Sequence, residues 1–461
     1  MGLILSILYL ITYYLTPVTV FGQLAGYRIE LILAVLVILV SIPSLLRTFI
    51  FRIPQSLALL GMAIAVPLSI FASVRWFGGA LDAFLGFIPN AFAFFLLCLH
   101  FRSTRRLKIL VAMLLFVCFF VIVHGYMAQI HGFPAEVAHQ PGFEGSPYLL
   151  AMSNNAGDWF YRLRGLGEIH DPNDFAQLLV SVIPLTFFFW RSRKFVSNFF
   201  LVLIPLSALL FGVYLTHSRG ALLAMMAMLI VAIRPRIGTA PSVILAGALF
   251  AVAKVFQFAG DRTISVEAGS DRISLWGQGL QVFKLHPLFG VGFGRLPNYT
   301  DVHLTAHNSI VVCAAELGFL GLYFWSLYLF PTVRDVLAIA SPAKVSEAEP
   351  EPEADDGERA PLPAPLRQRE KLDRSGINHL GRIVLLSFTG YLVSAWFLSR
   401  AYAVTLFLLG GIGEVVFEMA LERGMVAPRM KFFRVLRNAG VLAVGLLAVM
   451  YLTLRVINII H

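Results

Sequence analysis

The chain has 461 residues, of which 58% are hydrophobic and only 13% are charged, and its mean hydropathy is +0.79. A soluble protein of this length could not bury so much apolar surface, so we expect lipid to be the main solvent of the fold. The formal net charge of +10 would fit a nucleic-acid-binding protein, but the basic residues fall in short clusters between apolar runs. That pattern is typical of cytoplasmic loops and argues against a nucleic-acid partner.

The apolar residues gather in runs along the whole chain, and a spanning helix needs about 20 mostly apolar residues. The runs predict an all-α polytopic membrane protein with about 12–13 transmembrane helices. The first run has no basic segment before it and no clear cleavage site, so we expect a retained helix and not a signal peptide. The runs lie near residues 3–21, 31–46, 56–74, 81–99, 108–130, 175–190, 196–215, 221–233, 242–258, 309–330, 383–399, 401–420 and 438–457.

Clusters of arginine and lysine follow every second run, which gives the predicted orientation. Because basic residues are enriched in cytoplasmic loops, we expect these clusters and the amino terminus in the cytoplasm. The alternate loops, 131–174, 216–220 and 259–308, then face outward. The clusters are Arg47 with Arg52, Arg102 to Lys108, Arg191 to Lys194, Arg234 with Arg236, and Arg423 to Arg437.

An acidic, proline-rich segment at 341–374 interrupts the apolar runs. It cannot bury enough apolar area to fold, so we predict a disordered cytoplasmic linker and favour a solvated tether over the alternative, a docking tail. Transmembrane helices are expected in 1–130 and again in 383–461.

The three cysteines, Cys98, Cys118 and Cys313, all lie inside apolar runs. Their positions predict small buried side chains, with no disulfide framework and no metal-ligand spacing.

Two outward loops carry arginines next to predicted helix starts. In the first, Arg164 precedes Asp171 and Pro172, which suit the N-cap and first turn of the next helix. Arg164 either meets substrate phosphates or snorkels to lipid headgroups. In the second, Arg219 lies between two spans on the side where basic residues are rare, so it needs a partner. Its planar guanidinium suits a phosphate, and Gly220 would let the bound group approach the backbone.

The third outward loop carries a predicted amphipathic helix with an apolar face from Ile273 to Phe283. We expect it to lie in the membrane interface, capped by Ser270 or Asp271. Arg272 would then lie at the positive end of the helix dipole. A cation is unfavourable there unless it shares an anion with the helix end.

The same loop ends on His307 and Asn308, directly before a spanning helix. Asn308 or Ser309 can cap that helix, which gives Asn308 a structural role. His307 is an imidazole at the membrane surface that can exchange protons near neutral pH, and three arginines share its side of the membrane. Glu316 is about half a turn out of phase with His307, so we expect it to make a structural hydrogen bond to a neighbouring helix.

These motifs, taken together over residues 150–330, resemble the O-antigen ligase and polymerase superfamily of bacterial envelope membrane proteins. His217 departs from the pattern, because the family more often has a small or aromatic residue there. The resemblance makes 131–330 an O-antigen ligase-like core whose outer loops form a cavity. The matching pieces are Arg164-Gly165 before Asp171-Pro172-Asn173, then Ser218-Arg219-Gly220-Ala221, and the run from Asp271-Arg272 and Trp276 through His286-Pro287-Leu288-Phe289-Gly290-Val291-Gly292 to His307-Asn308 and Glu316-Leu317-Gly318.

The resemblance implies transfer of a glycan from undecaprenyl diphosphate to an acceptor hydroxyl, at the periplasmic face of the inner membrane and without a metal or other cofactor. Arg219 and Arg272, supported by Arg164, would hold the diphosphate, and His307 would act as general base. The partners would be the lipid-linked donor, a glycan or lipid A-core acceptor, and membrane lipids. Supporting residues would be Asn308, Gly220 and Glu316.

Three alternatives remain beside a ligase. A polymerase of the same superfamily would transfer the glycan to another lipid-linked repeat unit. The protein O-glycosylating branch often has a sizeable outer carboxy-terminal domain, and we disfavour it because the chain ends at His461 soon after its last run. A transporter of lipid-linked oligosaccharide or polysaccharide would instead place ionisable residues along a path through the membrane.

Overall fold

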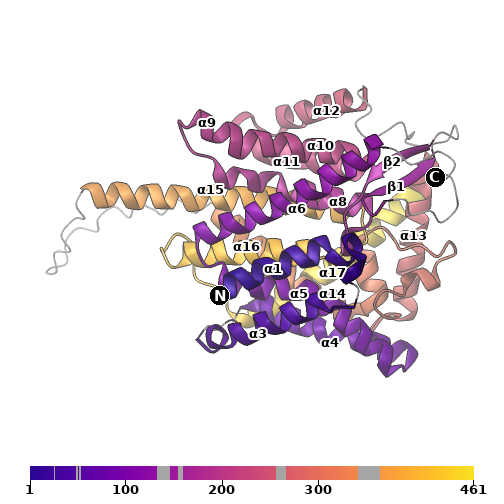
Figure 1. Cartoon of the computed structure of the whole chain (residues 1–461). Coiled ribbons are helices and arrows are strands. Elements are labelled where there is room, and N and C mark those ends of the chain that lie inside the picture. Colours follow the sequence, from indigo (N-terminus) through magenta and orange to yellow (C-terminus); the bar gives the residue numbers. More distant parts are fainter. Residues whose placement is uncertain are drawn as a thin grey trace.

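The computed structural model describes residues 1–24, 26–47, 50, 53–131, 146–153, 159–255, 266–340 and 364–460. As predicted, the chain is an all-α polytopic membrane protein, and its long helices run side by side in one bundle (Figure 1). The α-helices are α1 (Gly2–Leu15), α2 (Pro17–Val20), α3 (Ile29–Arg47), α4 (Pro54–Val74), α5 (Phe77–His100), α6 (Thr104–His131), α8 (Pro172–Val182), α9 (Phe195–Asn198), α10 (Ile204–Thr216), α11 (Arg219–Ile237), α12 (Thr239–Val255), α13 (Val266–Leu285), α14 (Ser309–Ala340), α15 (Ala364–Ala395), α16 (Val404–Leu421) and α17 (Phe432–Ile460).

Short helical turns and one hairpin complete the described part. The 3₁₀ turns are η1 (Gly22–Leu24), η3 (Gly167–Ile169), η4 (Pro184–Phe189) and η6 (Leu296–Tyr299), and η5 (Phe199–Leu203) is a π-helical turn leading into α10. The hairpin, β1 (Leu149–Ser153) and β2 (Trp159–Leu163), is antiparallel and pairs Leu149 with Leu163. The sequence analysis did not predict this hairpin inside the first outer loop.

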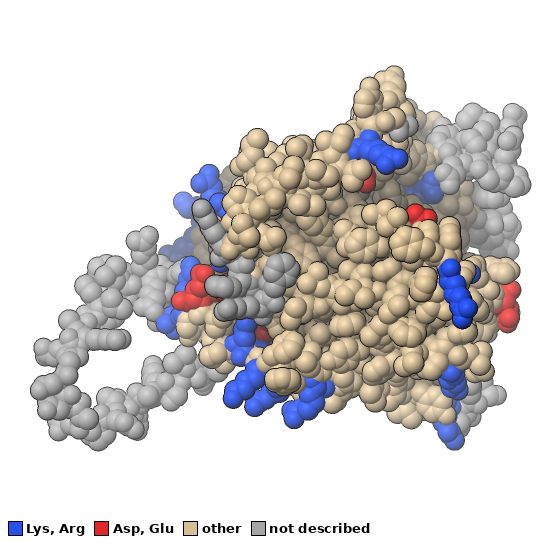
Figure 2. All heavy atoms as spheres, turned by 90° about the horizontal axis from the view of Figure 1, so that it is seen from below, with Lys and Arg blue, Asp and Glu red and all other residues tan. Residues whose placement is uncertain are grey.

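Ten of the described helices are long and apolar enough to cross a membrane. The runs predicted near the amino terminus and at 242–258 form the shorter apolar helices α1 and α12, and the run at 383–399 lies in the second half of α15. Every predicted run therefore coincides with a helical segment. In Figure 2 most of the visible charged side chains lie toward the two ends of the molecule, with a broad uncharged band between them, as expected for a lipid-facing surface.

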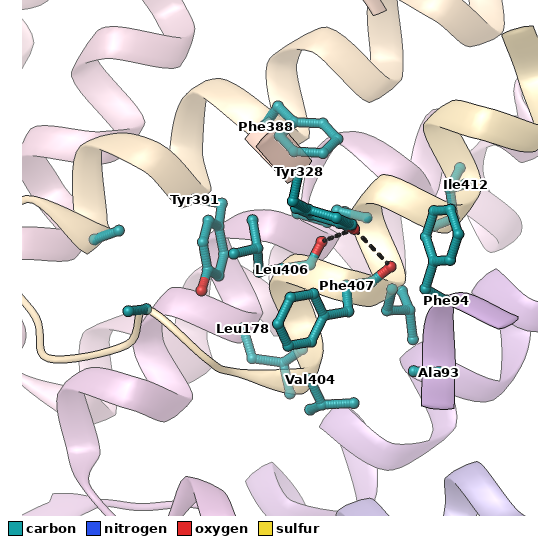
Figure 3. Close-up of a cluster of buried hydrophobic side chains, with 14 of the residues drawn as sticks. Ala93, Phe94, Leu178, Tyr328, Phe388, Tyr391, Val404, Leu406, Phe407 and Ile412 are labelled. Carbon is teal, nitrogen blue, oxygen red and sulfur yellow. Dashed lines mark hydrogen bonds between the residues drawn. The ribbon is translucent and has the colours of Figure 1, made fainter. Parts of the chain in front are cut away.

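The bundle is built around α14, which packs against α4, α15, α16 and α17. In its middle, Tyr328 is fully buried and donates its hydroxyl to the carbonyls of Leu406 and Phe407, each at 3.3 Å (Figure 3). Its ring meets Phe94 and Phe407 edge to face. A buried phenol needs such a partner, because lipid cannot satisfy its hydroxyl.

The elements of the predicted outer loops share one end of the bundle. In Figure 1 the β1–β2 hairpin and α13 lie at the end that also holds the carboxy terminus, whereas the amino terminus lies at the opposite end. At the end opposite the hairpin, Arg429 pairs with Glu414 and Glu418. The loops that the sequence predicts to face outward thus meet where a common site can form.

Helix α14 is broken at Gly318, and the segment 286–292 packs into the break. Gly318 has φ +66°, a left-handed conformation that glycine adopts without strain. The freed amide of Phe319 donates to the carbonyl of Pro287 at 2.7 Å, and the amide of Gly292 donates to the carbonyl of Glu316 at 2.9 Å. The glycine-rich segment therefore replaces the helix hydrogen bonds that the break removes.

Two predicted boundaries are corrected. Helix α15 already begins at Ala364, so the acidic linker is shorter than predicted. The reason lies in the residues that follow, because Pro365 fits a first helical turn and is followed by leucine, arginine, glutamine and glutamate, which favour a helix. Residues 341–363 lie outside the described residues. Helix α13 begins at Val266, so Ser270 and Asp271 are not its caps.

Candidate functional site

The turn at 396–403, between α15 and α16, is the hub of the outer end. The hydroxyl of Ser309 donates to the carbonyl of Leu398 at 2.7 Å and accepts the amide of Arg400 at 3.0 Å. The side chain of Asn308 donates to the carbonyl of Trp396 at 3.0 Å. The start of α14 and this turn are thereby joined, although about 90 residues separate them in the chain.

His307 lies at the junction of these two segments. Its backbone has φ +47°, an uncommon conformation for a residue with a side chain, and its amide donates to the hydroxyl of Ser399 at 3.0 Å. Burial lowers the pKa of the imidazole, and the positive charge of Arg272 lowers it further, while Asp171 opposes both. The lowered pKa favours the neutral imidazole, the form that accepts a proton.

The charge of Arg272 acts on His307, but Arg272 does not lie where the sequence predicts. Because α13 begins at Val266, Arg272 lies in its second turn and not at the positive end of the helix dipole. The helix is instead anchored by Trp276, which is buried and meets the ring of Trp396 edge to face at 6.2 Å. This contact fixes α13 against the same turn that holds His307.

Arg219 is the first residue of α11, directly after the tight turn that ends α10. Here a cation does lie at the positive end of a helix, where an anion can bind both the guanidinium and the free backbone amides. The Cα of Gly220 faces the 396–403 turn, because a Cβ built there would lie 3.9 Å from the Cβ of Phe397. That spacing is ordinary contact, so glycine is not required at 220 by the protein's own packing.

Arg164 is bound to the chain segment before β1. Its amide donates to the carbonyl of Tyr148 at 2.8 Å and its guanidinium donates to the carbonyl of Ser146 at 3.2 Å. The side chain is 8% exposed. A backbone carbonyl is thus one partner of Arg164, and its role toward phosphates or lipid headgroups stays a prediction.

Asn308 and Glu316 have the structural contacts that were predicted for them, with one change. Asn308 caps α14, since its side-chain oxygen accepts the amides of Ile310 and Val311 at 3.0 and 3.1 Å. The buried carboxylate of Glu316 accepts hydrogen bonds from the backbone of Gly294 and Leu296. The partner of Glu316 is therefore a loop and a 3₁₀ turn, and not a neighbouring helix.

The N-cap predicted for α8 is confirmed. The carboxylate of Asp171 accepts the amide of Asn173 at 2.7 Å, and Pro172 occupies the first turn. This fixes Asp171 at the surface of the bundle, where its charge acts on His307.

Arg162 in β2 was not singled out from the sequence. It is 3% exposed and donates to the carbonyl of Thr216 at 2.8 Å and to the side chain of Asn173 at 2.9 Å. It thereby ties the hairpin to the turn before Arg219 and to the start of α8. The arginine also lowers the pKa of the neighbouring His217, whose burial is the larger cause.

Arg400 was also missed, and a signal for it was present. Its guanidinium pairs with Asp174 of α8 across the outer end. The residue lies alone between the runs 383–399 and 401–420, so it resembles Arg219 as an arginine confined between two spans. Applying that argument to both short outer turns would have identified it.

The arrangement joins a neutral imidazole, cationic groups and carboxylates around one turn. Imidazole groups can exchange protons and guanidinium groups can bind anions, so these residue types suit proton transfer and anion binding. In the described part of the chain, no group of three or more histidine, cysteine, aspartate and glutamate side chains could hold a metal ion.

The comparison with known protein families gives a match for residues 204–326, to the family described as O-antigen ligase. No curated protein matches the chain. The matched segment runs from α10 into α14 and contains Arg219, Arg272 and His307, whereas Arg164 and Arg400 lie outside it. It supports a function of the O-antigen ligase or polymerase type in a multi-pass membrane protein. The match of this segment supports the predicted resemblance to the O-antigen ligase-like superfamily.

Proposed function

We propose that the protein transfers a glycan from undecaprenyl diphosphate to an acceptor hydroxyl at the periplasmic face of the bacterial inner membrane. His307 accepts the proton of the attacking hydroxyl, and Arg272 and Arg219 bind the diphosphate and stabilise its charge as it leaves. Arg164 supports the donor site. Cationic side chains take the place that a metal ion has in many glycosyl transfers, so the reaction is metal-independent.

The proposal is supported by the effect of the Arg272 charge on His307, both of which lie inside the family-matched segment. Burial and the arginine keep the imidazole neutral, and a neutral imidazole is the form required of a general base. The arginine next to the base offers the charge that a departing diphosphate needs. The proposed reaction needs a proton acceptor and a cationic group that act together, since it joins a hydroxyl to a sugar released from a diphosphate ester.

Within the superfamily we favour a ligase over a polymerase, which would use a second lipid-linked unit as acceptor. A transporter of lipid-linked glycan would need ionisable residues free to act along a path through the membrane. The candidates Glu414 and Glu418, in the second half of α16, are instead paired with Arg429, whereas His307 contacts the turn before α16. This pairing favours a site on one side of the membrane.

The test is envelope glycan profiling in a deletion strain that carries the wild type, His307→Ala or Arg219→Ala. We expect the wild type to restore the attached glycan and both variants to fail while reaching normal membrane levels. Loss of the general base should reduce transfer by about 10²–10⁴-fold. Long lipid-linked chains that accumulate without attachment would indicate a ligase, and single units would indicate a polymerase.

His303→Ala is the matched control, because His303 is an exposed histidine of the same loop that also has a left-handed backbone. It should restore the normal profile. Arg219→Lys keeps the charge but loses the planar fork, so we expect partial activity. A normal glycan profile in His307→Ala would contradict the proposed mechanism.

A further inference from the structure

A cavity opens beside the proposed catalytic histidine, between η3, α8 and the 396–403 turn. Its polar lining includes Glu168, Asp174, Gln177, Ser399 and Arg400. Asp174 and Gln177 are buried in α8, whereas Glu168 is exposed and lies at the rim. None of these residues belongs to the donor site proposed above.

The charge of this cavity suits a neutral, hydroxyl-rich ligand and not a phosphate. Arg400, the cationic residue of the cavity, is paired with Asp174, and the negative charges of Glu168 and Asp171 also act on its guanidinium. An anion entering the cavity would therefore meet more carboxylates than cations. Carboxylates accept hydrogen bonds from sugar hydroxyls, and amide and guanidinium groups donate to their oxygens.

One wall of the cavity is aromatic. Phe293 and Tyr402 both line it, with ring centroids 5.1 Å apart. A sugar ring has an apolar face of C–H groups and a rim of hydroxyls. A pocket with an aromatic wall and a few placed polar groups matches both parts.

Ser399 connects the cavity to the base. It lines the cavity, and its hydroxyl accepts the amide of His307 at 3.0 Å and contacts the hydroxyl of Thr305. A sugar bound there would lie one side chain away from the backbone of His307, whose imidazole also experiences the charge of Arg272.

We propose that the cavity is the acceptor subsite, which binds the sugar that carries the attacking hydroxyl. This assignment rests on the proposed glycosyl transfer and specifies which substrate the pocket receives. Its hydroxyl gives its proton to His307 as its oxygen forms the new glycosidic bond, while the bond from the donor sugar to the diphosphate breaks and the diphosphate leaves as an anion.

The experiment measures binding of neutral oligosaccharides, released by mild acid from the envelope glycans of the host strain, to the purified full-length protein in detergent. Saturation-transfer NMR and titration calorimetry report the Kd. We expect the wild type and His307→Ala to bind equally, because binding does not need the base. Glu168→Gln should weaken binding about tenfold, the effect of one hydrogen bond to a charged group. Inorganic diphosphate should not compete.

Asp301→Asn is the matched control, since Asp301 is an exposed outer-loop carboxylate that does not line this cavity. Its Kd should equal that of the wild type. No binding to the wild type, unchanged binding to Glu168→Gln, or displacement by diphosphate would each overturn the subsite. If His307→Ala kept transfer activity in the host, the proposed mechanism would fail instead, whereas loss of binding in Glu168→Gln would still identify the cavity as a sugar site.

Discussion

At the scale of single residues, His307 combines an unusual backbone with a tuned side chain. Its left-handed conformation costs of order 1 kcal/mol or more, and the Ser399 hydrogen bond and the Asn308 cap hold it in place. Such strain persists where the surroundings over-determine a residue, which is common at functional sites. The same packing buries the imidazole and brings the opposite charges of Arg272 and Asp171 to bear on it.

These two charges predict how activity depends on pH. His307 must be neutral to act as a base, and its pKa is lowered from 6.5. The midpoint of the decline in kcat/KM on the acidic side should therefore lie below pH 6.5. Asp171→Asn removes the charge that raises the pKa and should move this loss to still lower pH, while keeping an N-cap residue at α8. Arg272→Gln removes a charge that lowers the pKa and should move the loss to higher pH.

The measurement is the pH profile of glycan transfer in isolated membranes between about pH 5 and 8, the range where histidine titrates. Arg272→Gln should also reduce the rate at every pH, because Arg272 binds the diphosphate, so only the position of the acidic limb is compared. Opposite displacements in the two variants support His307 as the titrating base. Identical limbs in both variants and the wild type would assign that titration to another group.

At the scale of elements, the break in α14 decides how the outer loop is held. A Cβ built at Gly318 would lie 2.4 Å from the backbone carbon of Leu288, and the residue has φ +66°. Gly318→Ala should therefore combine backbone strain of about 1–3 kcal/mol with a clash against backbone, which cannot move as a side chain can. We expect less folded protein in the membrane and a lower melting temperature in detergent.

Gly445→Ala in α17 is the control for this prediction. Gly445 has no atom within 4 Å of a built Cβ and an ordinary helical backbone, so alanine should be neutral or slightly stabilising. Equal melting temperatures for Gly318→Ala and the wild type would show that the break does not need glycine.

Elements with a strong local pattern were predictable, and elements defined by distant partners were not. Each apolar run gave a helix, and Asp171 with Pro172 marked the start of α8, because spanning length and capping depend on neighbouring residues alone. The break at Gly318 depends on the segment from Pro287, about 30 residues away, which supplies the replacement hydrogen bonds. The β1–β2 hairpin lies in an outer loop for which the sequence analysis predicted no strand.

At the scale of the whole molecule, the site is assembled from segments that no local pattern connects. His307 meets Ser399, and Arg400 meets Asp174, across 92 and 226 residues of chain. The sequence predicts that Arg219, Arg272 and His307 share one side of the membrane, since alternation of spans and basic loops determines that much. It does not identify the 396–403 turn as their hub, because that depends on how α15 and α16 pack against α14.

The orientation of the whole bundle gives the last prediction. The native cysteines Cys98, Cys118 and Cys313 are buried, so a single introduced cysteine can report on its own side of the membrane. In intact spheroplasts, a membrane-impermeant maleimide should label Asp301→Cys and leave Ala427→Cys unlabelled, although both positions are exposed on the protein. After permeabilisation both should react. Asp301 shares a loop with His307, so its labelling reports the side of the membrane on which the imidazole lies. Labelling of Ala427→Cys alone before permeabilisation would place the imidazole in the cytoplasm and exclude a periplasmic acceptor. The expected result instead puts the base on the side where lipid-linked glycans would be presented to it.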